Sequence, residues 1–87
     1  MNFYSISYDL RQPNRDYSNL YEAIKSFKLY IHPLESNWFI QSDWDAQDIY
    51  KKLRPCIDDN DLLLVIKVDK TDKQGWMVKS FWEWLNK

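Results

Sequence analysis

Strand-like and helix-like segments follow one another along this chain in the order β-α-β-β-α-β. Alternating or continuous apolar residues predict strands over residues 3–10, 28–32, 36–42 and 62–68. Apolar residues at helical spacing predict one helix over residues 17–27 and a second from position 43 or 45 to position 57. This order predicts an α+β protein of the ferredoxin-like type, with two helices on one face of a four-stranded antiparallel sheet. The other face of the sheet is then left for something else to cover.

The first predicted strand, residues 3–10, has a carboxylate near its C-terminal end. Strand alternation places Asp9 on the same face as Ser7, and a polar loop with Arg11 and Arg15 follows directly. Acidic and basic groups gathered at the end of a strand are typical of places that handle ions or phosphates. The same carboxylate can instead form a salt bridge with the loop.

Each predicted helix has one apolar stripe. The two stripes consist of Leu20, Ala23, Ile24 and Phe27, and of Ile49, Leu53 and Cys56. Asp16 is the predicted N-cap of the first helix, and Asp43 or Asp45 that of the second. Pro55 is expected to end the last turn of the second helix.

The remaining strands differ in character. The strand over residues 28–32 is expected to stop at Pro33 and to join the next strand through a bulged connection without glycine. The segment over residues 62–68 is the most apolar of the four, which predicts a central position in the sheet. The three aspartates before it, Asp58, Asp59 and Asp61, lack the pattern of a calcium loop and predict a solvated turn.

The chain is expected to form one domain, whose ferredoxin-like core ends near residue 69. Residues 1–69 form the predicted core, and residues 70–87 form a linker and an aromatic helix that packs on the core or on a partner protomer. The apolar stripe of this helix consists of Val78, Phe81, Trp82 and Leu85. Trp84 lies off the stripe and is expected to be exposed or to contact a partner.

Composition bounds the classes of protein to which this chain belongs. Aromatic residues make up 17% of 87 residues, which suggests more apolar surface than one protomer covers and favours a homodimer. A small core filled with large rings is the other interpretation. The net charge of −1 disfavours strong nonspecific binding to nucleic acid but leaves a local basic patch open. The single cysteine suits the cytoplasm, and no apolar run of about 20 residues predicts membrane insertion.

Asp9 is the candidate metal ligand and catalytic residue. One carboxylate holds Mg²⁺ or Mn²⁺ poorly, because these ions prefer about six oxygen ligands. Two copies across a two-fold axis would double the ligand count. Arg11 and Arg15 are candidates for nucleic-acid binding through their phosphate groups. Ser7 and His32 are accessory candidates, Ser7 beside Asp9 and His32 as an acid or base or as a structural residue next to Glu35.

A family resemblance adds to these expectations. The strand end Tyr8-Asp9, the loop with Arg15 and the third strand Ser36-Asn-Trp-Phe39 resemble the second CRISPR-associated protein family, the Cas-two family. Residues 8–17 and 32–38 resemble more closely a group of small bacterial proteins labelled SinR family. The resemblance covers about residues 3–68 and leaves the tail outside.

The resemblance implies a homodimer formed by sheet-on-sheet packing, with two copies of Asp9 facing each other. It also implies a protein of nucleic-acid metabolism, for which two activities stay open. One is a metal-dependent endoribonuclease or endonuclease that uses Mg²⁺ or Mn²⁺. The other is a non-catalytic dimeric module that binds protein or nucleic acid, RNA or DNA, within a defence or toxin–antitoxin system.

Overall fold

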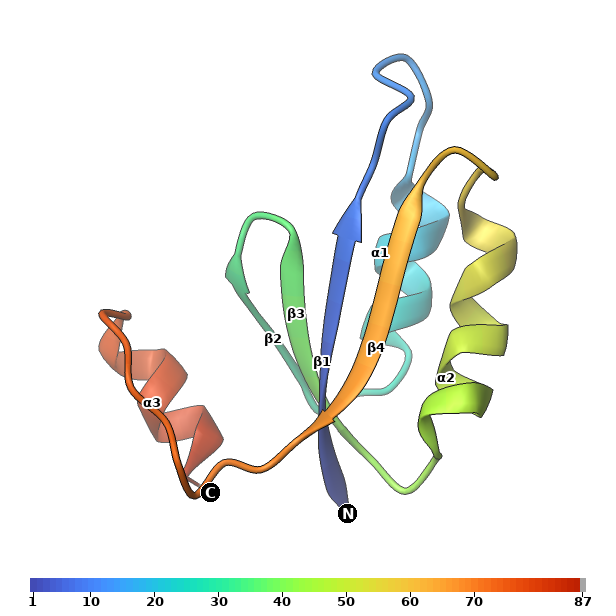
Figure 1. Ribbon diagram of the computed structural model, residues 1–87. Helices are drawn as coiled ribbons and strands as arrows, with labels where there is room; N and C mark the ends of the chain where they lie inside the picture. Colours follow the sequence, from blue (N-terminus) through green and yellow to red (C-terminus); the bar gives the residue numbers. More distant parts are fainter. Residues whose placement is uncertain (87) are drawn as a thin grey trace.

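Residues 1–86 form an α+β domain with one four-stranded antiparallel sheet and three α-helices, as predicted at the level of class (Figure 1). The computed structural model describes residues 1–86. The elements in chain order are β1 (Asn2–Asp9), α1 (Ser18–Lys25), β2 (Tyr30–Leu34), β3 (Asn37–Ser42), α2 (Ala46–Leu53), a short 3-10 turn η1 (Arg54–Cys56), β4 (Leu62–Val68) and α3 (Lys79–Leu85).

The strand order across the sheet is β2-β3-β1-β4, and all neighbouring strands are antiparallel. Ile6 on β1 lies between Trp38 on β3 and Val65 on β4. The prediction that residues 62–68 form a central strand is therefore wrong, because β4 is an edge. Its continuous apolar run has a different cause. Leu63 and Val65 pack toward the helices, while the residues between them face the opposite side of the sheet.

Helices α1 and α2 cover one face of the sheet and form the main core with it (Figure 1). The fully buried side chains are Ile6, Leu20, Ile24, Ile40, Ile49 and Leu53. Burying each of these stabilises the fold by about 1.5–3 kcal/mol relative to exposure. The predicted stripes of both helices are confirmed, with Ala23, Phe27 and Cys56 partly buried at their margins. No helix in the described part of the chain has the length and apolar character needed to cross a bilayer.

Element ends differ from the prediction at several places. Helix α1 ends at Lys25 and not at Phe27, and β2 begins at Tyr30 and not at Lys28. Helix α2 ends at Leu53, before the η1 turn that contains Pro55, and does not continue to Ile57.

Strand β2 continues through Pro33 instead of stopping there, which an edge strand tolerates, and its pairing with β3 shifts between Ile31 and Leu34 as expected of a bulge. Tyr17, not Asp16, is the N-cap of α1, although Asp16 still accepts the N–H of Ser18 at 2.9 Å. At α2 the cap is Asp45, which accepts the N–H of Asp48 at 2.8 Å.

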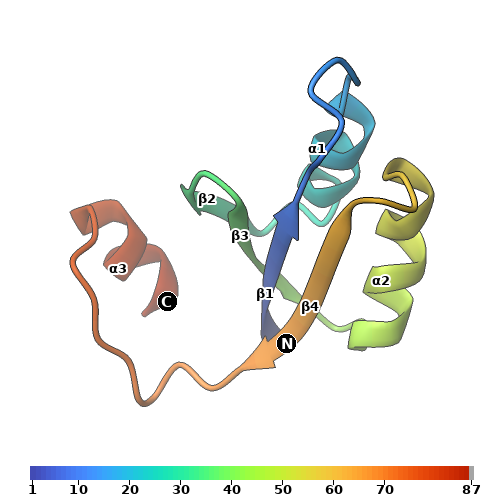
Figure 2. The same cartoon turned by 45° about the horizontal axis from the view of Figure 1, so that its top comes forward.

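Helix α3 packs on the face of the sheet opposite α1 and α2, which we call the open face. Phe81 and Leu85 are buried there together with Phe3, beside Ile31 and Phe39. Figure 2 shows α3 next to β2 and β3 and away from β4. The helix therefore covers only part of the open face.

The tryptophans of the tail are placed differently from the prediction. Trp84 is half-buried, with its ring edge-to-face on Phe3 at 5.5 Å, so its expected exposure is wrong. Trp76 in the linker is the fully exposed tryptophan. Val78 precedes α3 and is 64% exposed, which removes it from the predicted stripe.

Candidate functional site

Asp9 stands at the end of β1 and is paired with the arginine that follows it. Arg11 donates from Nε and Nη2 to the same oxygen, Asp9 Oδ2, at 3.2 Å and 3.0 Å. Both side chains are more than half exposed, and an exposed pair of this kind contributes about 0–1 kcal/mol to stability. The salt-bridge alternative for Asp9 is therefore present in the structure. Because the pair is weak, the carboxylate remains open to competition from another cation.

Ser7 lies beside Asp9 in a shallow hollow of the open face. The hollow has a volume of about 320 Å³ and is lined by Ser7, Tyr8, Asp9 and residues 62–64. Asn37 donates its amide N–H groups to Ser5 Oγ at 2.7 Å and to Ser7 Oγ at 2.9 Å. Asn37 Oδ1 is buried and has no hydrogen-bond partner within residues 1–86. The middle of the open face thus carries a row of polar side chains, Ser5, Ser7 and Asn37, which we call the polar line.

The oxygen atoms around Asp9 and Ser7 are too few to hold a divalent metal ion within one protomer. The described residues hold no group of three or more histidine, cysteine, aspartate or glutamate side chains close enough to bind one ion. Asp9 with Ser7 offers two kinds of oxygen from one protomer, whereas Mg²⁺ prefers six oxygen ligands, several of them waters. A site of useful affinity here requires a second carboxylate from another copy of the chain.

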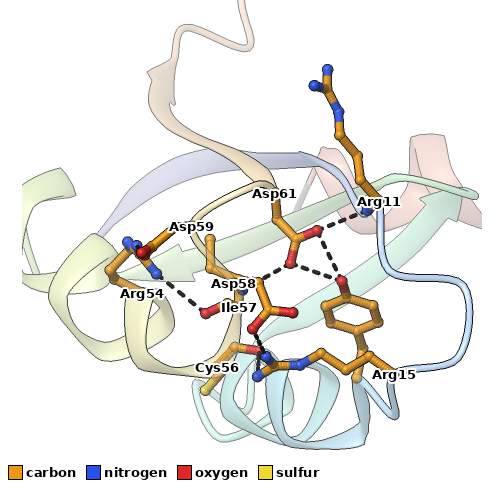
Figure 3. A network of polar contacts seen from close by, with 9 residues as sticks. Arg11, Arg15, Arg54, Cys56, Ile57, Asp58, Asp59 and Asp61 are labelled. Carbon is orange, nitrogen blue, oxygen red and sulfur yellow. Dashed lines mark hydrogen bonds and ion pairs between the residues drawn. The ribbon is translucent and has the colours of Figure 1, made fainter.

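Arg15 is held in the loop between β1 and α1. Its guanidinium forms an ion pair with Asp58, donates to the carbonyl oxygen of Cys56 at 3.3 Å and lies 5.4 Å from the centre of the Tyr17 ring. Figure 3 shows the side chain of Arg11 extending in a different direction. The structure does not bring the two predicted phosphate-binding arginines together.

Asp61 is a residue of this region that the sequence pattern did not reveal. Its carboxylate is buried and accepts the backbone N–H groups of Arg11 at 2.7 Å and Asp58 at 2.8 Å (Figure 3). The Tyr17 hydroxyl lies 2.8 Å from Oδ2 and donates to the same carboxylate. The prediction of a solvated turn is wrong for this residue, because Asp61 joins the loop after β1 to the turn before β4.

The pKa values in this network follow from its hydrogen bonds. Burial on its own raises the pKa of a carboxyl group. At Asp61 the backbone N–H donors and the Tyr17 hydroxyl outweigh burial, so its pKa lies below the usual aspartate value. Burial, and then donation to Asp61, raise the pKa of Tyr17. Asp61 is therefore an ionised anchor for the loop that carries Arg11 and Arg15.

His32 lies on the other face of the sheet from Asp9. Its ring stacks on Trp38 with centroids 3.9 Å apart, and Nε2 is 3.1 Å from the carbonyl oxygen of Glu35. Trp38 is itself buried on the helix side and donates to the Tyr8 hydroxyl at 2.9 Å. The structure keeps His32 apart from Asp9 and Ser7, and its contacts are those of a residue that fixes the β2–β3 connection.

An apolar stripe on β4 is left uncovered on the open face. Leu62, Leu64 and Ile66 are 54%, 56% and 52% exposed, and α3 does not cover them. Strand pairing puts Ile66 opposite Ser5 and Leu64 opposite Ser7. The stripe thus borders both the polar line and the hollow with Asp9.

No family model, curated protein or solved structure matches this chain.

Proposed function

We propose that this protein is a ferredoxin-like, Cas-two-like homodimer whose protomers pack through their open faces. The observation that carries the proposal is the exposed stripe of Leu62, Leu64 and Ile66 on β4. Neighbouring apolar side chains that remain exposed on a sheet face indicate an interaction surface. The element order and the strand order β2-β3-β1-β4 support the ferredoxin-like part of the proposal.

A second copy of the chain suits the open face chemically. The residues in its middle are all uncharged: Ser5, Ser7, Asn37, Leu64 and Ile66. A patch of this kind can pack on its own copy about a two-fold axis without burying an unpaired charge. The small serines allow two sheets to approach closely. The apolar stripe of each copy is then buried against the open face of the other copy.

For the role of the dimer, the geometry favours a non-catalytic binding module of nucleic-acid metabolism, such as one in a defence or toxin–antitoxin system. Asp9 forms an exposed, weak ion pair with Arg11, and Arg15 pairs with Asp58. Within residues 1–86, one protomer also brings together too few carboxylates to hold Mg²⁺ well. A binding role requires neither ion pair to break.

A metal-dependent endonuclease or endoribonuclease is the second candidate, and one observation favours it. Asp9 and Ser7 line a hollow that reaches the proposed dimer face. Packing two open faces together can bring both Asp9 carboxylates to one place, where they would hold Mg²⁺ or Mn²⁺. Such an ion would activate water and stabilise negative charge on a phosphodiester. The ion pair between Arg11 and Asp9 would then have to break.

Two measurements test these proposals separately. Light scattering should give a dimer mass for wild type and a monomer mass for Leu64→Lys at the same concentration, because a buried pair of ammonium groups is costly. Val78→Lys, at an exposed position away from the stripe, should remain dimeric. A monomeric wild type would rule out the dimer.

The choice between binding and cleavage needs labelled single-stranded RNA and duplex DNA with and without Mg²⁺ or Mn²⁺. The binding module predicts no cleavage by wild type under any of these conditions. Metal-dependent cleavage that disappears in Asp9→Asn, with the dimer intact, would establish the nuclease instead.

A further inference from the structure

Trp44 forms an exposed aromatic platform at the end of the sheet far from Asp9. It lies in the loop between β3 and α2, and 46% of its surface is exposed. The loop is fixed on both sides of the ring. The backbone N–H of Trp44 donates to Ser42 Oγ at 3.0 Å, and Asp45 caps α2.

The indole is oriented by two neighbours. The ring of Phe27 meets it edge-to-face, with centroids 5.2 Å apart and planes at 83°. The Lys52 ammonium lies 5.5 Å from the Trp44 ring and 5.4 Å from the Phe27 ring. These contacts are of the strength of ordinary aromatic and cation–π pairs. They preset the ring and place a positive charge beside it.

Two hollows adjoin the platform, and Trp44 and Lys52 line both of them. One has a volume of about 230 Å³ and includes Phe27 and Ser42 among its walls. The other has a volume of about 360 Å³ and is completed by Lys51 and Asp48. The ring therefore borders open space at which a planar group can stack, with ammonium groups within the same walls.

The charges around the platform leave its lysines available. The carboxylate of Asp43 lies 3.7 Å from the amino group of Met1. Asp48 is the acidic residue that shares a hollow with the two lysines. Asp45, the N-cap of α2, is a third exposed carboxylate beside the ring, so this surface carries charges of both signs. Lys51 and Lys52 are its side-chain ammonium groups, and within residues 1–86 neither takes part in an ion pair.

We propose that this platform binds single-stranded nucleic acid, with one base stacked on Trp44 and an adjacent phosphate on Lys51 and Lys52. Exposed aromatic rings beside lysines bind single strands because every base has a stacking face. A duplex hides those faces and demands a larger basic surface. The proposal rests on the proposed role in nucleic-acid metabolism and deepens it by naming the ligand and its place.

The platform does not depend on the dimer. Ser42 is paired with Asn2 at the start of β1, whereas Ser7, beside Asp9, is paired with Asn37. The platform also lies next to α1 and α2 rather than on the open face. Failure of dimerisation and failure of this site are therefore separate results.

The test is fluorescence anisotropy of labelled oligothymidylate and oligouridylate of about 12 nucleotides, at low salt, with the full chain. Trp44→Leu should weaken binding about 5- to 100-fold, as expected for the loss of one stacked base. Trp44→Phe should lie between wild type and Trp44→Leu. The matched control Trp76→Leu, at a fully exposed tryptophan outside both hollows, should bind like wild type.

The charge contribution is tested in the same assay. Lys51→Gln with Lys52→Gln should weaken binding and lower the dependence of log K on log salt by about 0.7 for each phosphate that is no longer neutralised. Lys67→Gln with Lys79→Gln removes the same charge elsewhere and should leave that slope unchanged. Melting temperatures identify any variant that fails to fold. If Trp44→Leu is such a variant, the binding affinity of Trp44→Phe shows whether the ring contributes to binding.

Two results would overturn the proposal. The first is a wild type that binds neither oligonucleotide more tightly than about 1 mM, which is weaker than nonspecific binding usually is. The second is an affinity for the oligonucleotide that is the same in wild type, Trp44→Leu and Trp76→Leu.

Discussion

The buried hydroxyl of Tyr17 donates to the carboxylate of Asp61 across 44 residues of sequence, at 2.8 Å. The hydrogen bond joins the start of α1 to the turn before β4. Arg11 adds its backbone N–H to the same carboxylate. The loop that follows Asp9 is thereby fixed to the body of the domain. Any function of the Asp9 end depends on this anchor.

Removing the anchor should destabilise the protein. We expect Asp61→Asn to lower the melting temperature by several degrees, because an amide cannot accept all of the N–H and O–H donors that the carboxylate accepts. Asp59 offers the matched control, since its side chain is 95% exposed and pairs with Arg54 at the surface. Asp59→Asn should melt within about a degree of wild type. Equal melting temperatures for the two variants would show that Asp61 is not an anchor.

The depressed pKa of Asp61 predicts an acid sensitivity with a definite sign. Its pKa is lowered in the folded state, so its contribution to stability is present above the usual aspartate pKa of 3.8 and is lost as the pH falls through the lowered value. Urea unfolding at pH values from neutral down to about 3 measures this. The free energy of unfolding of wild type should fall more steeply in the acid range than that of Asp61→Asn. Parallel curves would contradict the assignment.

Two isoleucines on different strands separate core packing from surface packing. Ile40 is fully buried beneath the helices, so Ile40→Ala should lower the free energy of unfolding by about 2–5 kcal/mol. Ile66 is 52% exposed on the open face. Ile66→Ala should leave the unfolding of the isolated protomer nearly unchanged but weaken the dimer. Urea unfolding at low protein concentration and light scattering at high concentration distinguish the two effects.

The tail helix should separate from the sheet without unfolding it. Phe81 and Leu85 are the residues by which α3 is buried on the open face. We expect Phe81→Ala to increase amide exchange across residues 79–85 while β1 and β3 keep their protection. Trp76→Ala, which removes a fully exposed ring, should leave the exchange of α3 unchanged. Loss of protection throughout the sheet would mean that the tail belongs to the core.

Alternation and helical spacing sufficed to predict the elements. The apolar face of β1 and the stripes of α1 and α2 lie where these patterns place them, because each is set by residues close in sequence. The position of β4 was predicted wrongly, since an apolar run is equally suited to the middle of a sheet and to an edge that carries an exposed stripe.

Long-range partners explain the other errors. Nothing local distinguishes Asp61 from the solvated acids beside it, because the hydroxyl that binds it comes from Tyr17. Helical spacing predicts that Trp84 is exposed or contacts a partner, but its ring packs edge-to-face on Phe3 at the other end of the chain. The pairing of Asp9 with Arg11, only two residues apart, was among the sequence alternatives.

Packing of two copies of the chain through their open faces underlies both candidate functions. An isotope-filtered NOE experiment on a mixture of ¹³C-labelled and unlabelled protein reports on this packing atom by atom. We expect intermolecular NOEs from the methyl groups of Leu62, Leu64 and Ile66 to the open face of the other copy. A dimer by light scattering whose intermolecular NOEs lie elsewhere, or no dimer at all, would refute the proposed packing.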